Sequence, residues 1–337
     1  MEYPIPLKSH KAFEWLIEKS IRPRNPSLIF DRFTPRLDTV PDKEKGTVKS
    51  DFLKLVRDSA KLTEEQLFNE WNTRWERLIA SAEAKYFELQ TDWRLIAGLG
   101  KKGSLEVGFT FHRYGFPYLP GSSLKGLARA YGLLEIAEAI GGEMLKKADN
   151  DKPLTKLDEA LSQDEEKKFK DALNNYKVNQ DSPALNMAEA FRCIFGTTEQ
   201  AGKAIFFDAI PKSVPTLDLD IMNPHYPDYY NDRDGKQGVF PTNWQSPIPV
   251  QFLTVASGTV FRFAIGWRSS PQDNDPDSEK KQTEFSWWKG EQIERIKNQA
   301  PSDHPRMQKL ARRWLEGGLL NLGAGGKTSA GYGYFKE

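Results

Sequence analysis

Apolar residues recur along this chain with two different spacings, and the order of these spacings limits its fold. Apolar residues at every second position indicate half-buried strands, and a stripe at every third or fourth position indicates an amphipathic helix. The segments expected to be strands are 104–111, 204–210, 252–267 and 330–335. The helical stripes between them are Leu124, Leu127, Ala128, Tyr131 and Leu134, and then Met307, Leu310, Ala311, Trp314 and Leu315.

With its insertions left out, the chain has the element order β–α–β–β–α–β. This is the order of a ferredoxin-like, RRM-type core, in which both helices cover one face of an antiparallel sheet. We therefore predict an α+β fold with a ferredoxin-like core, a helical N-terminal extension and large insertions. The second face of such a sheet is open to a ligand, a common position for RNA.

The predicted core occupies residues 95–337, and residues 1–94 form the helical extension. In the extension, 63–66 has the form of a capping box, which predicts the start of a long amphipathic helix. The apolar face expected for that helix is Leu67, Trp71, Trp75, Leu78, Ala82 and Tyr86. The core has two predicted insertions, a charged, helix-prone one at about 141–190 and one with little regular structure at 212–247.

Composition excludes several classes of protein. With Lys+Arg 48 against Asp+Glu 47, the net charge of +1 excludes a uniformly basic nucleic-acid coat but allows a local basic cleft. Cys193 is the only cysteine, so neither an intramolecular disulfide nor a multi-cysteine metal site is expected. No two of the 4 histidines have metal-ligand spacing. We see no signal peptide and no membrane span, and expect a cytoplasmic protein without a membrane partner.

The glycine-rich segment 323–333 contains a Gly-Lys-Thr step that resembles a phosphate-binding loop. A P-loop requires glycine five residues before Gly326, where this chain has Asn321, so no nucleotide cofactor is expected. The backbone N–H groups of consecutive glycines can still donate hydrogen bonds to the phosphate oxygens of a phosphodiester. The residues expected to contact RNA here are Gly325, Gly326, Lys327, Thr328 and Ser329. The alternative is a glycine connection that only allows a helix to pack tightly on a strand.

A second candidate RNA contact lies at the start of the helix predicted after Pro120. A helix N-terminus carries partial positive charge, a serine there can act as cap, and cations four residues apart share a face. The residues proposed for RNA backbone binding are Gly121, Ser122, Ser123, Lys125 and Arg129. The alternative is an ordinary capped helix with solvated cations.

Two further groups of residues have more than one interpretation. His112 could contact RNA, act as general base on a ribose 2′-hydroxyl, or simply pack. The acidic residues of the second insertion could hold a divalent metal or form a solvated loop, and the latter is expected because no EF-hand pattern is present. These acidic residues are Asp218, Asp220, Asp228, Asp232 and Asp234. The clustered Tyr of 225–230 could stack on bases or anchor the loop.

Taken together, the motifs resemble a known family. The segments that carry the resemblance are 120–126, 194–197, 202–211 and 326–333. Their order is similar to that of the RAMP superfamily of CRISPR-associated proteins, which have RRM-like cores and a C-terminal glycine-rich loop. The segment 220–226 resembles the sixth-subunit family of the Cmr complex, the type III-B effector.

The resemblance implies a non-catalytic RNA-binding subunit of that effector. Such a subunit caps the backbone filament near the 3′ end of the guide RNA and contributes to antiviral defence through RNA-guided recognition of target RNA. Its partners are guide RNA, target RNA and other Cmr subunits, and 212–247 would project like a thumb. The alternatives are a metal-independent endoribonuclease that processes CRISPR transcripts, with His112 as general base, and a structural adaptor without RNA contact.

Overall fold

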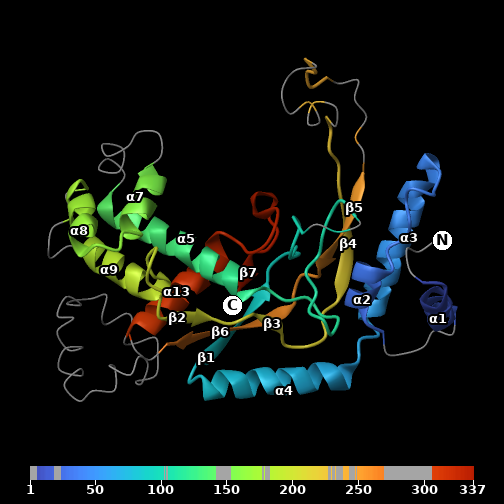
Figure 1. The fold of residues 1–337 in the computed structure, drawn as a ribbon, viewed down its shortest axis with the longest axis horizontal. Coiled ribbons are helices and arrows are strands. Elements are labelled where there is room, and N and C mark those ends of the chain that lie inside the picture. Colours follow the sequence, from blue (N-terminus) through green and yellow to red (C-terminus); the bar gives the residue numbers. More distant parts are fainter. Residues whose placement is uncertain are drawn as a thin grey trace.

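The structure is a computed structural model of the chain. It describes residues 6–18, 24–101, 103, 105–141, 153–176, 178, 183–226, 229, 232, 238–242, 247, 249–268 and 306–337. The N-terminal helices α1 (Leu7–Glu18), α2 (Pro26–Arg32) and α3 (Asp42–Ala60) gather at one end of the molecule, and a helical group at the other, with two sheets between them (Figure 1). The chain is therefore a mixed α+β structure.

The larger sheet is antiparallel and has the strand order β2-β6-β1-β7, with β3 also paired to β6. Its strands are β1 (Lys85–Thr91), β2 (Ala204–Phe206), β3 (Ile210–Pro211), β6 (Val260–Trp267) and β7 (Phe335–Lys336). The central pair is β1 and β6, in a register that joins Lys85 to Ile265 and Gln90 to Val260. The last strand is shorter than predicted, because Thr328–Ala330 forms the 3₁₀ helix η2.

The predicted first strand, 104–111, is wrong. Val107, Phe109 and Phe111 are buried, but the backbone bonds to the preceding loop: the Gly108 amide donates to the Leu99 carbonyl and the Thr110 amide to the Ala97 carbonyl. The strand that enters the sheet is β1, before residue 95, and it pairs with strands that follow that residue. The division into domains at residue 95 stays a prediction.

Helices α5 (Gly121–Ile140) and α13 (Arg306–Asn321) pack against each other on one side of this sheet (Figure 1). Leu127 of α5 adjoins Gly318 of α13, whereas Gly132 adjoins Trp314, so the helices run antiparallel. The predicted end of α13 at Gly317 and Gly318 is wrong, because the helix continues to Asn321. The two glycines instead leave room for the side chains of α5.

The opposite face of the sheet is covered by α4 (Glu65–Ser81), so the predicted open face is wrong. Trp75 packs against Ala264 of β6 and, together with Asn72 and Glu76, holds the buried Arg262. The expected apolar stripe of α4 is displaced, and the buried residues are Phe68, Asn72, Trp75 and Ile79. The capping box does not form either, since the Thr63 hydroxyl donates to the Ala60 carbonyl (2.9 Å) and Glu64 occupies the cap position.

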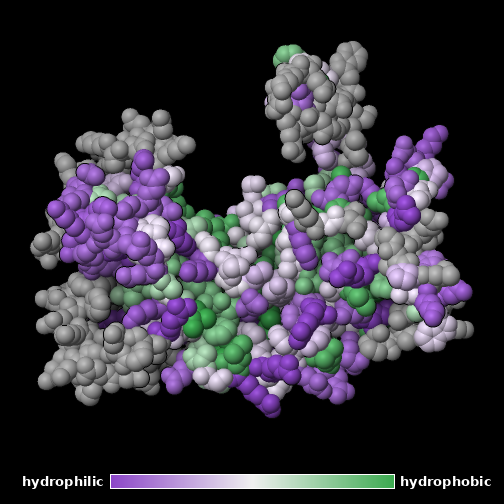
Figure 2. All heavy atoms as spheres, in the orientation of Figure 1, coloured by the Kyte–Doolittle hydropathy of each residue, from purple (hydrophilic) through white to green (hydrophobic). Residues whose placement is uncertain are grey.

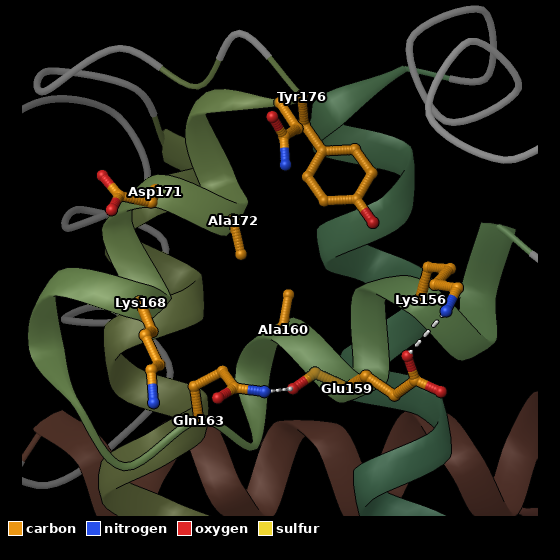
Figure 3. A pocket seen from close by; sticks show the side chains of 9 residues that line it. Lys156, Glu159, Ala160, Gln163, Lys168, Asp171, Ala172 and Tyr176 are labelled. Atoms are coloured by element: carbon orange, nitrogen blue, oxygen red, sulfur yellow. Dashed lines mark hydrogen bonds and ion pairs between the residues drawn. The ribbon is translucent and has the colours of Figure 1, made fainter.

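The described part of the first insertion is helical, as predicted. It comprises α7 (Pro153–Leu161), α8 (Glu166–Asn174) and α9 (Pro183–Phe195). The visible surface over α7 and α8 is strongly hydrophilic (Figure 2). An open pocket of about 800 Å³ lies there (Figure 3), and ion pairs such as Lys156–Glu159 and Lys168–Glu165 already use its charges.

The second insertion begins with a strand, contrary to the expectation of little regular structure. β4 (Leu217–Met222) pairs antiparallel with β5 (Val250–Val255) and joins Leu217 to Val255. The two strands form a ribbon that extends away from the larger sheet (Figure 1). Most of residues 227–248, including Asp228 and Asp234, lie outside the described residues.

Candidate nucleic-acid interface

The glycine-rich loop follows α13 and is docked on the segment after β1. The amide of Gly326 donates to the Ile96 carbonyl (2.9 Å), and that of Gly333 donates to the Arg94 carbonyl (2.9 Å). The loop closes on itself through the Ala324 amide and the Gly333 carbonyl, 2.8 Å apart. These bonds fix the path of the loop.

Two of its glycines are required by close packing. Gly325 has φ +84°, and a Cβ there would lie 2.2 Å from the Ile96 carbonyl oxygen. Gly333 has φ +76°, and its Cβ would lie 1.9 Å from the carbonyl oxygen of Ala324. At these positions glycine is needed for structure, as the packing alternative predicts.

Other groups of the same loop stay available to a ligand. Within the described part of the chain, the amides of Gly325 and Lys327 donate no hydrogen bond, and the Lys327 ammonium forms no ion pair. Gly325 and Ser329 are exposed, while Gly326, Lys327 and Thr328 are half-buried. Two open amides, one cation and neighbouring hydroxyls form a surface that suits an anion.

The N-terminus of α5 is capped differently from the prediction. Its amide at Gly121 donates to Asp208 Oδ1 (2.7 Å), and neither Ser122 nor Ser123 forms a capping bond, although both are exposed. A Cβ on Gly121 would lie 2.1 Å from the Phe206 carbonyl oxygen, which explains the glycine. The Gly121 amide is therefore already bound to a carboxylate.

The cations of this helix belong to a larger positive cluster. Burial and the neighbouring guanidinium groups of Arg129 and Arg268 lower the pKa of the Lys125 ammonium. Arg129 is held by Asp158 and by Ser162 Oγ (3.0 Å), whereas Lys125 has no ion-pair partner among the described residues. Sequence reasoning missed Arg268, whose only signal is a cation directly after a strand.

The two candidate segments lie toward the same end of the helix pair. Because α5 and α13 are antiparallel, the first turn of α5 and the glycine-rich loop after α13 lie at the same end (Figure 1). Lys125 and Lys327 thus both lie toward this end of the helix pair, although about 200 residues separate them in the sequence.

His112 packs beneath α4 and lies near Asp208, the carboxylate that binds the first amide of α5. Its ring packs against Trp71 of α4 (4.5 Å between centroids) and Phe116 (4.6 Å). Its Nδ1 accepts from the Tyr114 amide at 3.4 Å. Burial and the charge of Arg113 lower its pKa to about 4. The lowered pKa favours the neutral imidazole near pH 7.

Asp220 has a structural role next to the glycine-rich loop. Its Oδ2 accepts from Arg94 Nη1 (2.6 Å) and from the Tyr332 hydroxyl (2.7 Å). Burial and this carboxylate raise the pKa of Tyr332 to about 12. Asp218 Oδ2 lies 3.8 Å from Arg94 Nε. No group of three or more potential metal ligands occurs among the described residues.

Comparison with known proteins identifies the family. The sequence matches the RAMP superfamily over residues 86–336. The chain belongs to the RAMP superfamily. It is also 31% identical over 295 residues to the CRISPR system Cmr subunit Cmr6 of Pyrococcus furiosus, which covers 81% of this chain and 73% of that protein. The resemblance inferred from the motifs is thereby confirmed.

Solved structures of RAMP proteins and their complexes are also similar to this chain. The crystal structure of Cmr6 from Pyrococcus furiosus has a TM-score of 0.42 at 28% identity and covers 75% of this chain and 97% of that one. A chain in a cryo-EM structure of the type III-B Cmr-β complex bound to cognate target RNA has a TM-score of 0.45 at 17% identity. The match covers 88% of this chain and 72% of that one. Among the described helices of this RAMP chain, none is both long and apolar enough to cross a bilayer.

Proposed function

We propose that this chain is a non-catalytic RNA-binding subunit of a type III-B CRISPR effector complex. The observation that carries the proposal is its 31% identity with Cmr6 over 81% of its length. In this role it caps the backbone filament near the 3′ end of the guide RNA, in the cytoplasm, and contributes to RNA-guided antiviral defence. Guide RNA, target RNA and the other subunits of the complex are its partners.

The core of this subunit is ferredoxin-like in our proposal. Strands β1, β2 with β3, β6 and β7 supply the four strand positions, and α5 and α13 supply the two helices. Their sheet order, β2-β6-β1-β7, supports this assignment because the first and third core strands are central. The β4–β5 ribbon is an insertion between the second and third core strands.

RNA is held through its sugar-phosphate backbone in this proposal. Lys125 and Lys327 supply unpaired charge, and the open amides of Gly325 and Lys327 supply donors. Such contacts carry no sequence information, which suits a guide that must be held whatever it encodes. Recognition of the target is left to base pairing.

The absence of catalysis is part of the proposal. The low pKa of His112 and its place under α4 both disfavour a general base at the ribose. Incubation of the purified protein with CRISPR repeat RNA without metal should leave the RNA intact. Cleavage that His112→Ala abolishes would establish the endoribonuclease alternative.

The binding role is tested by removing the two candidate cations, Lys125 and Lys327. The affinity of the assembled complex for guide RNA should fall in Lys125→Ala/Lys327→Ala. The slope of log K against log salt should flatten by about 1.4, since each lost contact with single-stranded RNA contributes roughly 0.7. The control is Lys11→Ala/Lys43→Ala, which removes the same charge from the exposed α1 and α3. Equal slopes in the two double variants would refute the binding site.

A further inference from the structure

We propose that Trp93 is a stacking platform for a nucleobase beside the glycine-rich loop. This inference rests on the proposed RNA-binding function and adds a base contact to it. Trp93 lies two residues after the end of β1, and the residue is 49% exposed. Its neighbours in sequence bind the C-terminal limb of the loop: the Asp92 amide donates to the Tyr334 carbonyl (2.8 Å), and the Arg94 carbonyl accepts from Gly333 (2.9 Å).

The indole is held in place before any ligand arrives. The Arg94 guanidinium lies over its ring, 5.3 Å from the centroid. That guanidinium is itself fixed, because Nη1 donates to Asp220 Oδ2 (2.6 Å), which also accepts from the Tyr332 hydroxyl. A ring whose orientation is already fixed loses little conformational freedom on binding, and this favours affinity.

The charges around Trp93 favour a base over a phosphate. Asp218 and Asp220 lie beside Arg94, and Asp92 is paired with Lys336 (2.9 Å). These carboxylates repel a phosphate, whereas the uncharged face of a base meets no such penalty. Arg94 occupies one face of the indole, which leaves the other for stacking. RNA is favoured over a protein partner because the open amides and Lys327 belong to the same loop.

The test compares Trp93→Ala with the wild-type chain in the assembled complex. Loss of one stacked base should weaken guide RNA binding by about 5- to 100-fold. The slope of log K against log salt should not change, because no phosphate contact is lost. Trp93→Phe should retain most of the affinity, which excludes misfolding as the cause. Trp15→Ala is the matched control, since Trp15 on α1 is 55% exposed and far along the chain from the loop.

A second measurement uses RNA whose 3′ segment carries abasic ribose. For this RNA the difference between Trp93→Ala and wild type should disappear. An unchanged affinity for ordinary RNA in Trp93→Ala, or an equal loss with abasic RNA, would overturn the stacking role while leaving the phosphate site intact. Loss of a partner subunit from the complex with unchanged RNA affinity would assign Trp93 to a protein interface instead. Failure of the wild-type complex to bind RNA would instead refute the proposed function itself.

Discussion

Two glycines of the C-terminal loop allow the effect of close packing on stability to be measured separately from the effect of backbone conformation. Gly325 and Gly331 have nearly equal φ angles, +84° and +88°. They differ in surroundings, because a Cβ on Gly325 would lie 2.2 Å from the Ile96 carbonyl oxygen, whereas one on Gly331 has nothing within 4 Å. Alanine at either position has the same unfavourable φ, and only at Gly325 does it also collide with backbone.

The expected free energies follow from these two effects. The left-handed conformation costs an alanine about 1–2 kcal/mol, part of which is offset by the lower entropy of its unfolded chain. Gly331→Ala should therefore lower the free energy of unfolding by about 1 kcal/mol. Gly325→Ala should add about 1–3 kcal/mol of overpacking to that loss. It should also move the loop away from Ile96 and weaken RNA binding.

Urea unfolding of both variants, with equal m-values required, measures the difference. Guide RNA affinity in the assembled complex then reports whether the loop has moved. Equal destabilisation of the two variants would show that the contact with Ile96 does not constrain the loop. Normal RNA binding by a clearly destabilised Gly325→Ala would show that the path of the loop is unimportant for binding.

Further predictions concern the elements around the site. Asp208→Ala removes the cap of α5 and should cost about 1 kcal/mol in urea unfolding, whereas Asp208→Asn keeps an acceptor for Gly121 and should cost less. His112 has a pKa of about 4 when folded and 6.5 as its ordinary value, so stability present above pH 6.5 should be lost towards pH 4. The free energy of unfolding should fall by about 2 kcal/mol over this pH range, after allowance for partial exposure. The variant His112→Phe should not show this fall in thermal unfolding. Gly317→Ala would place a Cβ 2.2 Å from the Tyr131 ring, and should lower the melting temperature; Tyr131→Ala in the same chain should relieve that clash.

The order of strands and helices could be predicted from the sequence better than the residues that form each of them. The stripe of the predicted helix includes Tyr86, because this residue continues the four-residue spacing from Ala82. The chain leaves the helix at Glu83, whose φ is +50°, and Phe87 and Leu89 then alternate with exposed residues in β1. Both spacings are present in this short segment, and tertiary pairing with β6 decides between them.

The glycine-rich segment could be found from composition, but its free groups could not. Which amides bind carbonyls depends on Arg94 and Ile96, more than 200 residues away along the chain. The roles of Asp208 and Arg268 have the same origin, since each depends on α5 as a partner. A single sequence contains no information about such distant neighbours. The expected serine cap of α5 fails for this reason, because Asp208 binds the Gly121 amide instead.

One carboxylate oxygen joins three separate parts of the chain. Asp220 Oδ2 belongs to the β4–β5 ribbon, and it is shared by Arg94 after β1 and by Tyr332 of the C-terminal loop. The ribbon is also joined to the other two parts by the paired backbone bonds of Leu95 and Val255 and by the ring contact of Phe252 with Tyr332, so bending the ribbon would strain the loop and the segment at Trp93 together.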